Sequence, residues 1–426
     1  MMESKQRYWL YGILVFVIVG VILISGCIKQ SGEKFNQTKP ETKQTPESQK
    51  YCGDGVCDGP ETSENCPEDC GGETINQTGW QQHPESESDI IIPNETGEVF
   101  QFLKSEAVAE GAYGFSIPVY DGENIVVSYN DNTNYEIMMV KYTKDLQRIG
   151  EPVALDNSKT YYGDHKHVFL DGYHYIVVGS HIGEKDAGTF VYSISKVDRN
   201  LNMVKSIQKD YNLGASNDMF MTTDGNYIYV GFLYGGEPGK NKKEGGHIVF
   251  VYDKNLNYIK TIDLTEPKHK NCAGATFADG KFYIFSSDGI VSTCPPPDTR
   301  LIVIPCDENL VPEVSEPITV INTENPDEFP TGVVYDKNRD RFYVAYNAGN
   351  RTNCKILSDG GLMKFYSVNL VAIDKNFEIL DKITVSSPGS RGHLLLVDDT
   401  LYVGYDTMTG TEGSGGAFLK MYKIMG

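Results

Sequence analysis

Apolar strands and short polar turns alternate along the chain from about Glu98 to its end, and the same order recurs six times. Each copy predicts a strand, an Asp-Gly-type turn, a second strand, a polar loop, a third strand and an Asp-x-Asn-Leu-type turn, in which Asp and Asn tolerate left-handed backbone. A β unit repeated in a fixed order is typical of a propeller, so we predict an all-β fold. The second strands of the copies resemble one another: Ile125–Tyr129, Tyr175–Gly179, Tyr227–Gly231, Phe282–Phe285, Phe342–Tyr346 and Leu401–Tyr405.

The sixth copy ends at the C-terminus without a fourth strand. A strand of suitable pattern, Val99–Leu103, precedes the first copy and belongs to no other. Pairing of this strand with Ala417–Ile424 would leave no bare sheet edge where the ring closes. We therefore predict a six-bladed β-propeller over residues 98–426, closed by its N-terminal strand. WD dipeptides and a Ser-x-Asp-x-Gly-x-Thr-Trp box are absent, so the resemblance is to the architecture and not to a family of known substrate.

The N-terminus has the pattern of an export signal over residues 1–27. Lys5 and Arg7 precede an apolar run that ends in Ile24-Ser25-Gly26-Cys27. This ending resembles a lipobox, in which the cysteine is acylated and becomes the first residue of the mature protein. An uncleaved transmembrane anchor is the alternative. Both predict an extracytoplasmic protein held at the outer face of the cell membrane, because the positive end stays in the cytoplasm.

Two polar linkers, residues 28–50 and 72–97, flank a small cysteine-rich segment at residues 51–71. The linkers lack the apolar content to bury a core, so we expect disorder there. In an exported chain four closely spaced cysteines predict two disulfides, and three pairings are possible. The segment resembles a short cysteine-rich module of archaeal and bacterial surface proteins, which implies a surface location and no activity. Its cysteines are Cys52, Cys57, Cys66 and Cys70.

Acidic side chains crowd this cysteine-rich segment, and their oxygens suit calcium. The candidate ligands are Asp54, Asp58, Glu61 and Asp69, although their spacing is not that of an EF-hand loop. A solvated acidic knot is the plainer interpretation. Zinc held by the four thiolates is the weaker alternative, because an oxidising compartment favours disulfides.

The formal net charge of −20 excludes nucleic acid as a partner, since no basic stripe offsets it. Sequons for N-glycosylation fit an exported protein, and they occur at Asn36, Asn76, Asn94 and Asn350. In the repeat region, Cys272, Cys294 and Cys354 belong to one rim by topology, so we expect a disulfide there.

The entrances to the innermost strands are polar, and in a propeller they converge on the mouth of the central channel. Long loops between second and third strands rise around the same rim, where binding tends to be located. A solvated channel without a ligand is the plainer alternative. The candidate ligand-binding residues are Asp164, His165, His167, Asn217, Asp218, Asn271, Glu328, Arg391 and His393.

His165 and His167 are two residues apart, so on a strand they share a face. Together with Asp164 or His393 they could ligate a metal, but such residues more often form hydrogen bonds in a watery channel. The leading prediction is a non-catalytic binding module for a glycan, peptide, solute or protein partner. The alternative is a glycoside hydrolase or lyase that uses two carboxylates at the mouth, drawn from Asp164, Asp218 and Glu328.

Overall fold

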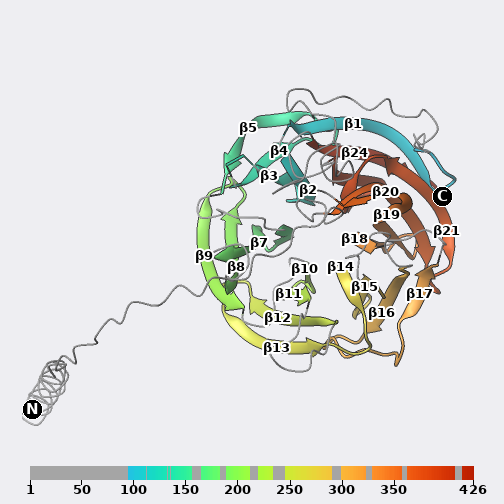
Figure 1. Cartoon of the computed structure of the whole chain (residues 1–426). Helices are drawn as coiled ribbons and strands as arrows, with labels where there is room; N and C mark the ends of the chain where they lie inside the picture. The colour runs from blue at the N-terminus through green and yellow to red at the C-terminus, as the bar shows by residue number, and fades with distance from the viewer. Residues whose placement is uncertain are drawn as a thin grey trace, which may run out of the picture. The chain divides into compact units, whose positions relative to one another are not determined.

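A computed structural model describes residues 95–111, 113–131, 133–134, 136–155, 165–182, 189–211, 219–233, 245–289, 299–322, 329–356, 362–407 and 415–426. These residues form 24 strands in six antiparallel sheets of four, arranged around a central axis (Figure 1). The predicted six-bladed β-propeller is therefore confirmed. The described part of the chain contains no helix long and apolar enough to cross a membrane.

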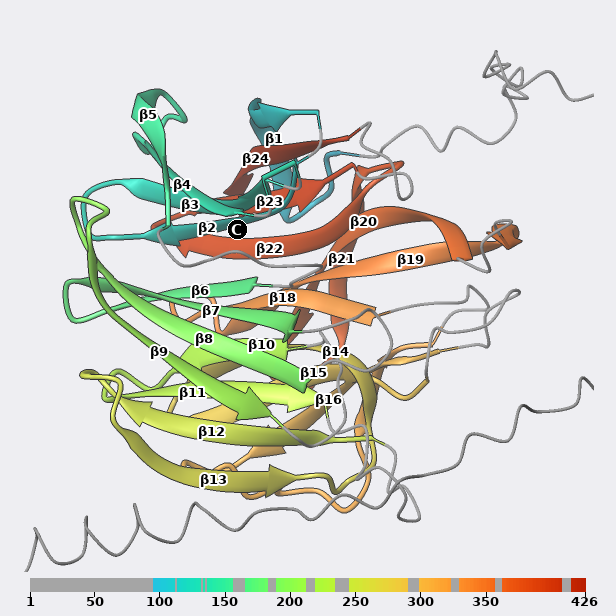
Figure 2. The same cartoon turned by 60° about the vertical axis from the view of Figure 1, so that its left-hand side comes forward.

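Blades 1 to 5 run outward from the axis in chain order (Figure 1 and Figure 2). Blade 1 comprises β2 (Tyr113–Tyr120), β3 (Ile125–Asp131), β4 (Glu136–Tyr142) and β5 (Arg148–Ala154). Blade 2 comprises β6 (His165–Leu170), β7 (Tyr173–Ile182), β8 (Thr189–Asp198) and β9 (Met203–Tyr211). Blade 3 comprises β10 (Met219–Thr223), β11 (Tyr227–Leu233), β12 (His247–Asp253) and β13 (Tyr258–Leu264).

The remaining blades follow the same plan except for the last. Blade 4 comprises β14 (Lys270–Ala278), β15 (Lys281–Ser287), β16 (Leu301–Cys306) and β17 (Ile318–Ile321). Blade 5 comprises β18 (Phe329–Asp336), β19 (Arg341–Ile356), β20 (Leu362–Asp374) and β21 (Ile379–Ser386). Blade 6 comprises β22 (Ser390–Val397), β23 (Thr400–Asp406) and β24 (Gly416–Ile424), and its outer strand is β1 (Phe100–Glu110).

The closing strand β1 is the predicted one, but it extends beyond Leu103 to Glu110. It pairs antiparallel with β24 in a register that sets Phe100 opposite Ile424. The backbone N–H of Val99 also donates to Asp381 Oδ2 of blade 5 at 2.7 Å, and that of Met425 donates to the Val99 carbonyl at 2.8 Å. The segment before β1 thus ties the last two blades together.

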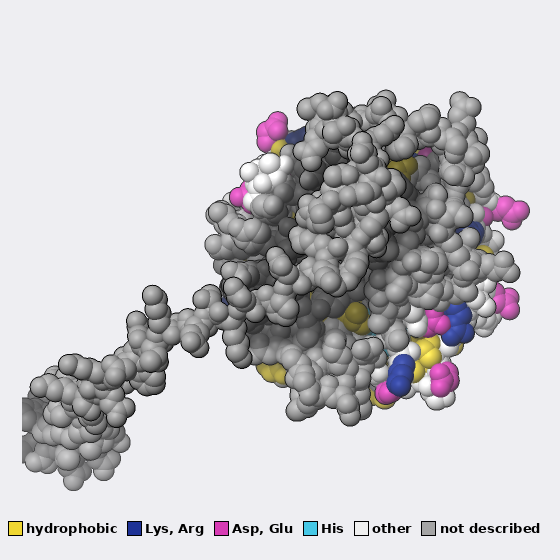
Figure 3. Space-filling model, viewed as in Figure 1, with side chains coloured by type: hydrophobic (Ala, Val, Ile, Leu, Met, Phe, Trp, Pro, Cys, Tyr) yellow, Lys and Arg dark blue, Asp and Glu magenta, His cyan; other side chains and the backbone are white. Residues whose placement is uncertain are grey.

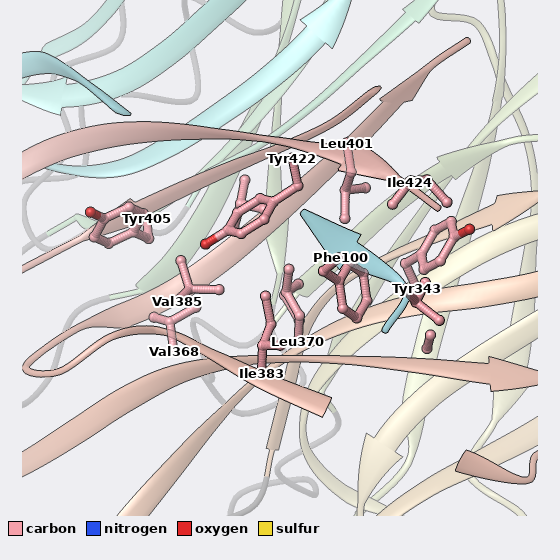
Figure 4. Packing of buried hydrophobic residues seen from close by; sticks show 14 residues of the cluster. Phe100, Tyr343, Val368, Leu370, Ile383, Val385, Leu401, Tyr405, Tyr422 and Ile424 are labelled. Carbon is pink, nitrogen blue, oxygen red and sulfur yellow. The ribbon is translucent and has the colours of Figure 1, made fainter. Parts of the chain in front are cut away.

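The core consists of apolar layers between neighbouring blades, because each sheet buries both faces. Figure 4 shows one such layer, in which side chains from blades 5 and 6 meet the closing strand. Phe100 is fully buried there, and its ring packs edge-on against Tyr343 at 5.7 Å and Tyr422 at 6.5 Å between centroids. The charged side chains of described residues that are visible in Figure 3 lie at the edge of that view.

The turns between third and fourth strands are capped by their first residue. In the blade 3 turn, Asp253 Oδ1 accepts the backbone N–H groups of Asn255 and Asn257, each at 2.8 Å. The residue with left-handed backbone is not Asp or Asn, as predicted, but Leu256, which has a φ of 59° and is buried. Left-handed backbone costs about 1–2 kcal/mol, whereas burying a leucine contributes about 1.5–3 kcal/mol, so burial offsets the strain. The equivalent residues with positive φ are Leu146, Leu201, Leu310 and Phe377.

Tyrosines in the second strands bond some of these turns across the junction between blades. Tyr175 Oη of blade 2 donates to the Lys254 carbonyl of the blade 3 turn at 2.7 Å, and Lys196 Nζ donates to the same carbonyl at 2.8 Å. Tyr402 Oη of blade 6 donates to the Lys144 carbonyl of the blade 1 turn at 2.7 Å. Each bond satisfies a turn carbonyl and fixes the distance between two sheets.

Replacing Phe100 with Ala should destabilise the propeller by about 3–5 kcal/mol, because the change empties a fully buried site in the closing layer. Replacing Leu103 with Ala is the matched control, since Leu103 lies on the same strand with 44% of its surface exposed. The control should change stability by less than about 0.5 kcal/mol. Urea unfolding of both variants measures the difference, and equal midpoints would contradict closure by β1.

Candidate functional site

The innermost strands of all six blades enclose a cavity of about 90 Å³ on the propeller axis. Backbones approach closely around it: a Cβ placed on Gly332 of blade 5 would lie 2.8 Å from the Gly392 carbonyl oxygen of blade 6. The cavity is therefore narrow but has room for ordered water. Equivalent positions of the six blades line it: Ile117, Pro118, Lys166, His167, Phe220, Met221, Gly274, Ala275, Thr331, Gly332, Val333, His393 and Leu394.

Two neighbouring innermost strands, β2 and β22, begin with the same backbone irregularity. Their registers shift between Gly114 and Ile117 and between Ser390 and His393. Each bulge contains one residue with left-handed backbone, Phe115 at a φ of 54° and Arg391 at 58°. The Arg391 guanidinium carbon lies 3.8 Å from the centre of the Phe115 ring, a cation–π contact. The two strained residues thus stack on each other.

Asp406 at the end of β23 holds this pair in place. Its carboxylate, which is fully buried, accepts from the Phe115 backbone N–H at 3.3 Å and from Arg391 Nη1 at 3.4 Å. The Arg391 backbone N–H donates to Asn347 Oδ1 at 3.1 Å, and Asn347 Nδ2 donates to Ser390 Oγ at 3.1 Å. This arrangement leaves the Arg391 side chain 36% exposed on a rigid support.

A chain of buried polar groups begins beside this pair and runs along β6. His165 Nε2 lies 2.9 Å from Ser128 Oγ, which is 3.1 Å from His167 Nδ1. His167 Nε2 in turn lies 3.0 Å from His174 Nδ1. His165 and His167 contact the same hydroxyl, so the prediction that they share a face is confirmed. Phe115 joins the chain to the bulges, since its ring packs against His165 at 6.0 Å between centroids.

Three buried polar atoms in the two bulged strands and β6 have no hydrogen-bond partner among the described residues: Ser116 Oγ, His165 Nδ1 and His393 Nε2; His174 Nε2 of β7 is a fourth. Their side chains are at most 5% exposed. Buried polar atoms are nearly always paired with protein or ordered water, so these three require a partner that is not a described side chain. Blades 6, 1 and 2 each contribute one such atom, and of these residues His393 lines the axial cavity, while Ser116 and His165 are the chain neighbours of the lining residues Ile117 and Lys166.

The histidines of the site are neutral near pH 7. Burial, with a smaller contribution from Lys166, lowers the pKa of His165 to about 3. The same causes, in the same order, lower the pKa of His393 well below its usual value, and burial lowers that of His174 to about 4. A neutral imidazole has one donor and one acceptor nitrogen, so the site offers both kinds of group without a net charge on these rings.

Among the predicted site residues, the structure brings His165, His167, Arg391 and His393 together. Asn271 lies in β14, and Cys272 and Cys354 lie in β14 and β19, but their side chains are outside the described part. Asp164, Asn217, Asp218, Glu328 and Cys294 lie outside the described residues, as do Cys27, the cysteine-rich segment and its acidic residues. Cys306 is a buried free thiol. In the described residues, no three His, Cys, Asp or Glu side chains form a metal-binding cluster.

Five residues of the site were not predicted from the sequence: Phe115, Ser128, His174, Asn347 and Asp406. A usable signal existed for Ser128, Asn347 and Asp406, because they are polar positions in or directly after otherwise apolar second strands. Phe115 had no such signal, since nothing in the sequence indicates that a phenylalanine adopts positive φ there.

No protein family matches the sequence, and no curated protein resembles it. Among solved structures, phage phi92 endosialidase aligns with a TM-score of 0.49 at 9% identity over 78% of this chain and 69% of its own. The haemagglutinin-neuraminidase of parainfluenza virus 5 aligns with a TM-score of 0.47 at 9% identity, over 77% and 95% of the two chains. A xylan β-1,4-xylosidase from Bacillus halodurans aligns with a TM-score of 0.42 at 10% identity, over 64% of this chain and 55% of its own.

Stability should fall as the pH decreases from about 6.5 to about 4.5. His165, His167, His174, His247, His269 and His393 all have a lowered pKa in the folded protein, with burial as the largest cause. In this window the histidines bind protons in the unfolded chain but stay neutral in the folded protein. Each histidine therefore lowers the unfolding free energy by up to about 1.4 kcal/mol for every unit by which the pH falls. Urea unfolding at stepped pH measures this slope, and a flat profile would contradict neutral buried rings.

Proposed function

We propose that the propeller is a non-catalytic binding module that recognises an uncharged, hydroxyl-bearing ligand, such as a glycan, at the channel mouth between blades 6, 1 and 2. The observation that carries the proposal is the group of three buried polar atoms without partners, Ser116 Oγ, His165 Nδ1 and His393 Nε2. Vicinal hydroxyls both donate and accept, so they match a hydroxyl and two neutral imidazoles.

The neighbouring Arg391–Phe115 pair supports a binding role. Strained backbone in non-glycine residues costs about 1–3 kcal/mol and clusters at ligand sites, where the surrounding structure enforces it. Here the hydrogen bonds of Asp406 and Asn347 hold the left-handed backbone of Phe115 and Arg391. As a result, the partly exposed Arg391 guanidinium has a fixed position. Because the groups are held before a ligand arrives, binding costs little ordering entropy.

Binding is preferred to hydrolysis because of the state of the described carboxylate. Asp406 is buried and accepts from Arg391 and from the Phe115 backbone, so it serves neither as a general acid nor as a nucleophile. Glycoside hydrolysis would need a pair among Asp164, Asp218 and Glu328 at a separation of roughly 5–9 Å. Turnover of a glycoside that is abolished by Asp164→Asn or Asp218→Asn would replace the binding proposal with the hydrolase.

The proposed location is the outer face of the membrane. The Ile24-Ser25-Gly26-Cys27 pattern supports a lipid anchor, and the polar linkers support a stalk that displays the propeller. The membrane and a surface ligand are the proposed partners.

Replacing Cys27 with Ser should abolish lipid labelling and leave the precursor unprocessed at that position, since only a thiol is acylated in this motif. Labelling with a fatty-acid probe in cells and the mass of the mature N-terminus measure both effects. Unchanged labelling and processing would contradict the lipid anchor and favour the transmembrane alternative.

Replacing Arg391 with Ala should weaken binding to a glycan array at least about tenfold, because the change removes a fixed donor from the mouth and releases the Phe115 ring. Arg148→Ala is the matched control, since the Arg148 side chain is 39% exposed on an outer strand and, among the described residues, bonds only its near neighbours in the chain, Glu151 at 3.4 Å and the Gly150 carbonyl at 3.3 Å. A wild-type ligand that binds the Arg391 variant and the control equally would place the site elsewhere.

A further inference from the structure

A second cavity, of about 470 Å³, lies between blades 3 and 4 at the rim of the Asp-Gly turns. Its volume falls within the range of about 300–1,000 Å³ that is usual for small-ligand sites. Sequence analysis assigned no function to this rim. Its lining comes from β11, β12, β13 and β14 and from the turns of both blades: Asp224, Asn226, Tyr227, Tyr229, Val251, Ile259, Lys260, Phe277, Glu308 and Asn309.

The junction at this cavity differs from the junction between blades 2 and 3. In the junction between blades 2 and 3, Tyr175 and Lys196 are paired across strands and both donate to the Lys254 carbonyl. Tyr229 and Val251 occupy the equivalent paired positions of blade 3. The equivalent carbonyl belongs to Glu308, which, like Lys254, is the second residue of its turn.

Both donors of that junction are missing here. Tyr229 Oη donates instead to Asp224 Oδ2 of its own blade at 2.8 Å, and this bond uses the single proton of the phenol. Val251 has no polar group with which to replace the lysine ammonium. The junction between blades 3 and 4 therefore lacks the two hydrogen bonds that close the junction between blades 2 and 3, and a groove is left in their place.

The chemistry of the groove suits a neutral saccharide. Its apolar surface includes Tyr229, Val251 and Phe277, and the Tyr227 ring beside them is 40% exposed. Such rings pack against the C–H face of a pyranose, as they do against other flat apolar surfaces.

The polar rim of the groove favours an uncharged ligand. Asn226 and Asn309 carry amides that both donate and accept, as vicinal hydroxyls do. Lys260 and Glu308 bring opposite charges, so together they select neither an anion nor a cation. The Asp224 carboxylate already accepts three hydrogen bonds, two from backbone N–H groups and one from Tyr229, which reduces its capacity to attract a cation.

We propose that this groove is a saccharide-binding site, separate from the channel mouth, in which Tyr227 stacks on a sugar ring and the amides of Asn226 and Asn309 bond its hydroxyls. The full chain, purified in detergent, should therefore bind immobilised neutral oligosaccharides through the groove. In the Arg391→Ala background, which removes the donor at the channel mouth, Tyr227→Ala should weaken the remaining binding at least about tenfold. Tyr258→Ala is the matched control, because Tyr258 begins β13 of the same blade, is 51% exposed and does not line the groove.

Val251→Lys tests the origin of the groove, because it restores the donor that closes the junction between blades 2 and 3. It should abolish oligosaccharide binding while the melting temperature stays within a few degrees of the wild type. If this variant unfolds, Tyr227→Ala and Tyr258→Ala still decide the question. Three results would overturn the proposal: no array oligosaccharide binds the wild type, binding that remains in the Arg391→Ala variant survives the further change Tyr227→Ala, or Tyr258→Ala in that background weakens binding equally. If Arg391→Ala alone abolished all oligosaccharide binding while Tyr227→Ala alone caused no loss, the groove proposal would be overturned and the channel-mouth site supported.

Discussion

The pairing of β1 with β24 is the interaction on which the rest of the structure depends. Every blade buries both faces against its neighbours, so a ring of blades is stable only when it has no free end. The strand that closes blade 6 also places Phe100 against Tyr343 of blade 5, and Val99 bonds Asp381 there. Closure therefore fixes two junctions at once, and with them the spacing of the six innermost strands around the axis.

That spacing explains why the channel mouth combines close packing with free polar groups. Backbones of blades 5 and 6 approach closely at Gly332 and Gly392, and His167 and His393 line the cavity that remains on the axis. The buried, neutral ring of His165 contacts Ser128 through Nε2 and leaves Nδ1 without a partner among the described residues. A site of this kind is rigid before any ligand arrives, so the proposed binding would cost little ordering entropy.

The sequence predicted what repetition can encode. The number of blades and the closing strand could be predicted from the six copies, their turn residues and the missing fourth strand. The two-residue repeat of a β-strand likewise predicted that His165 and His167 share one face. The sequence did not reveal the departures from repetition. Leucine in place of glycine at a left-handed position is stable only because tertiary packing buries it, as at Leu256. The stacking of Phe115 on Arg391 likewise depends on two bulges in neighbouring blades that no local pattern specifies.

The central claim is that the free imidazole nitrogens at the channel mouth receive a ligand. Nitrogen-15 NMR of the histidine rings tests it most directly, since the tautomer and hydrogen bonding of each ring nitrogen are read separately. At pH 7 the rings of His165 and His393 should be neutral, and a bound glycan should shift the signals of His165 Nδ1 and His393 Nε2 while those of the distant His269 stay unchanged. Charged rings in the free protein, or a glycan that binds without shifting either signal, would contradict the account.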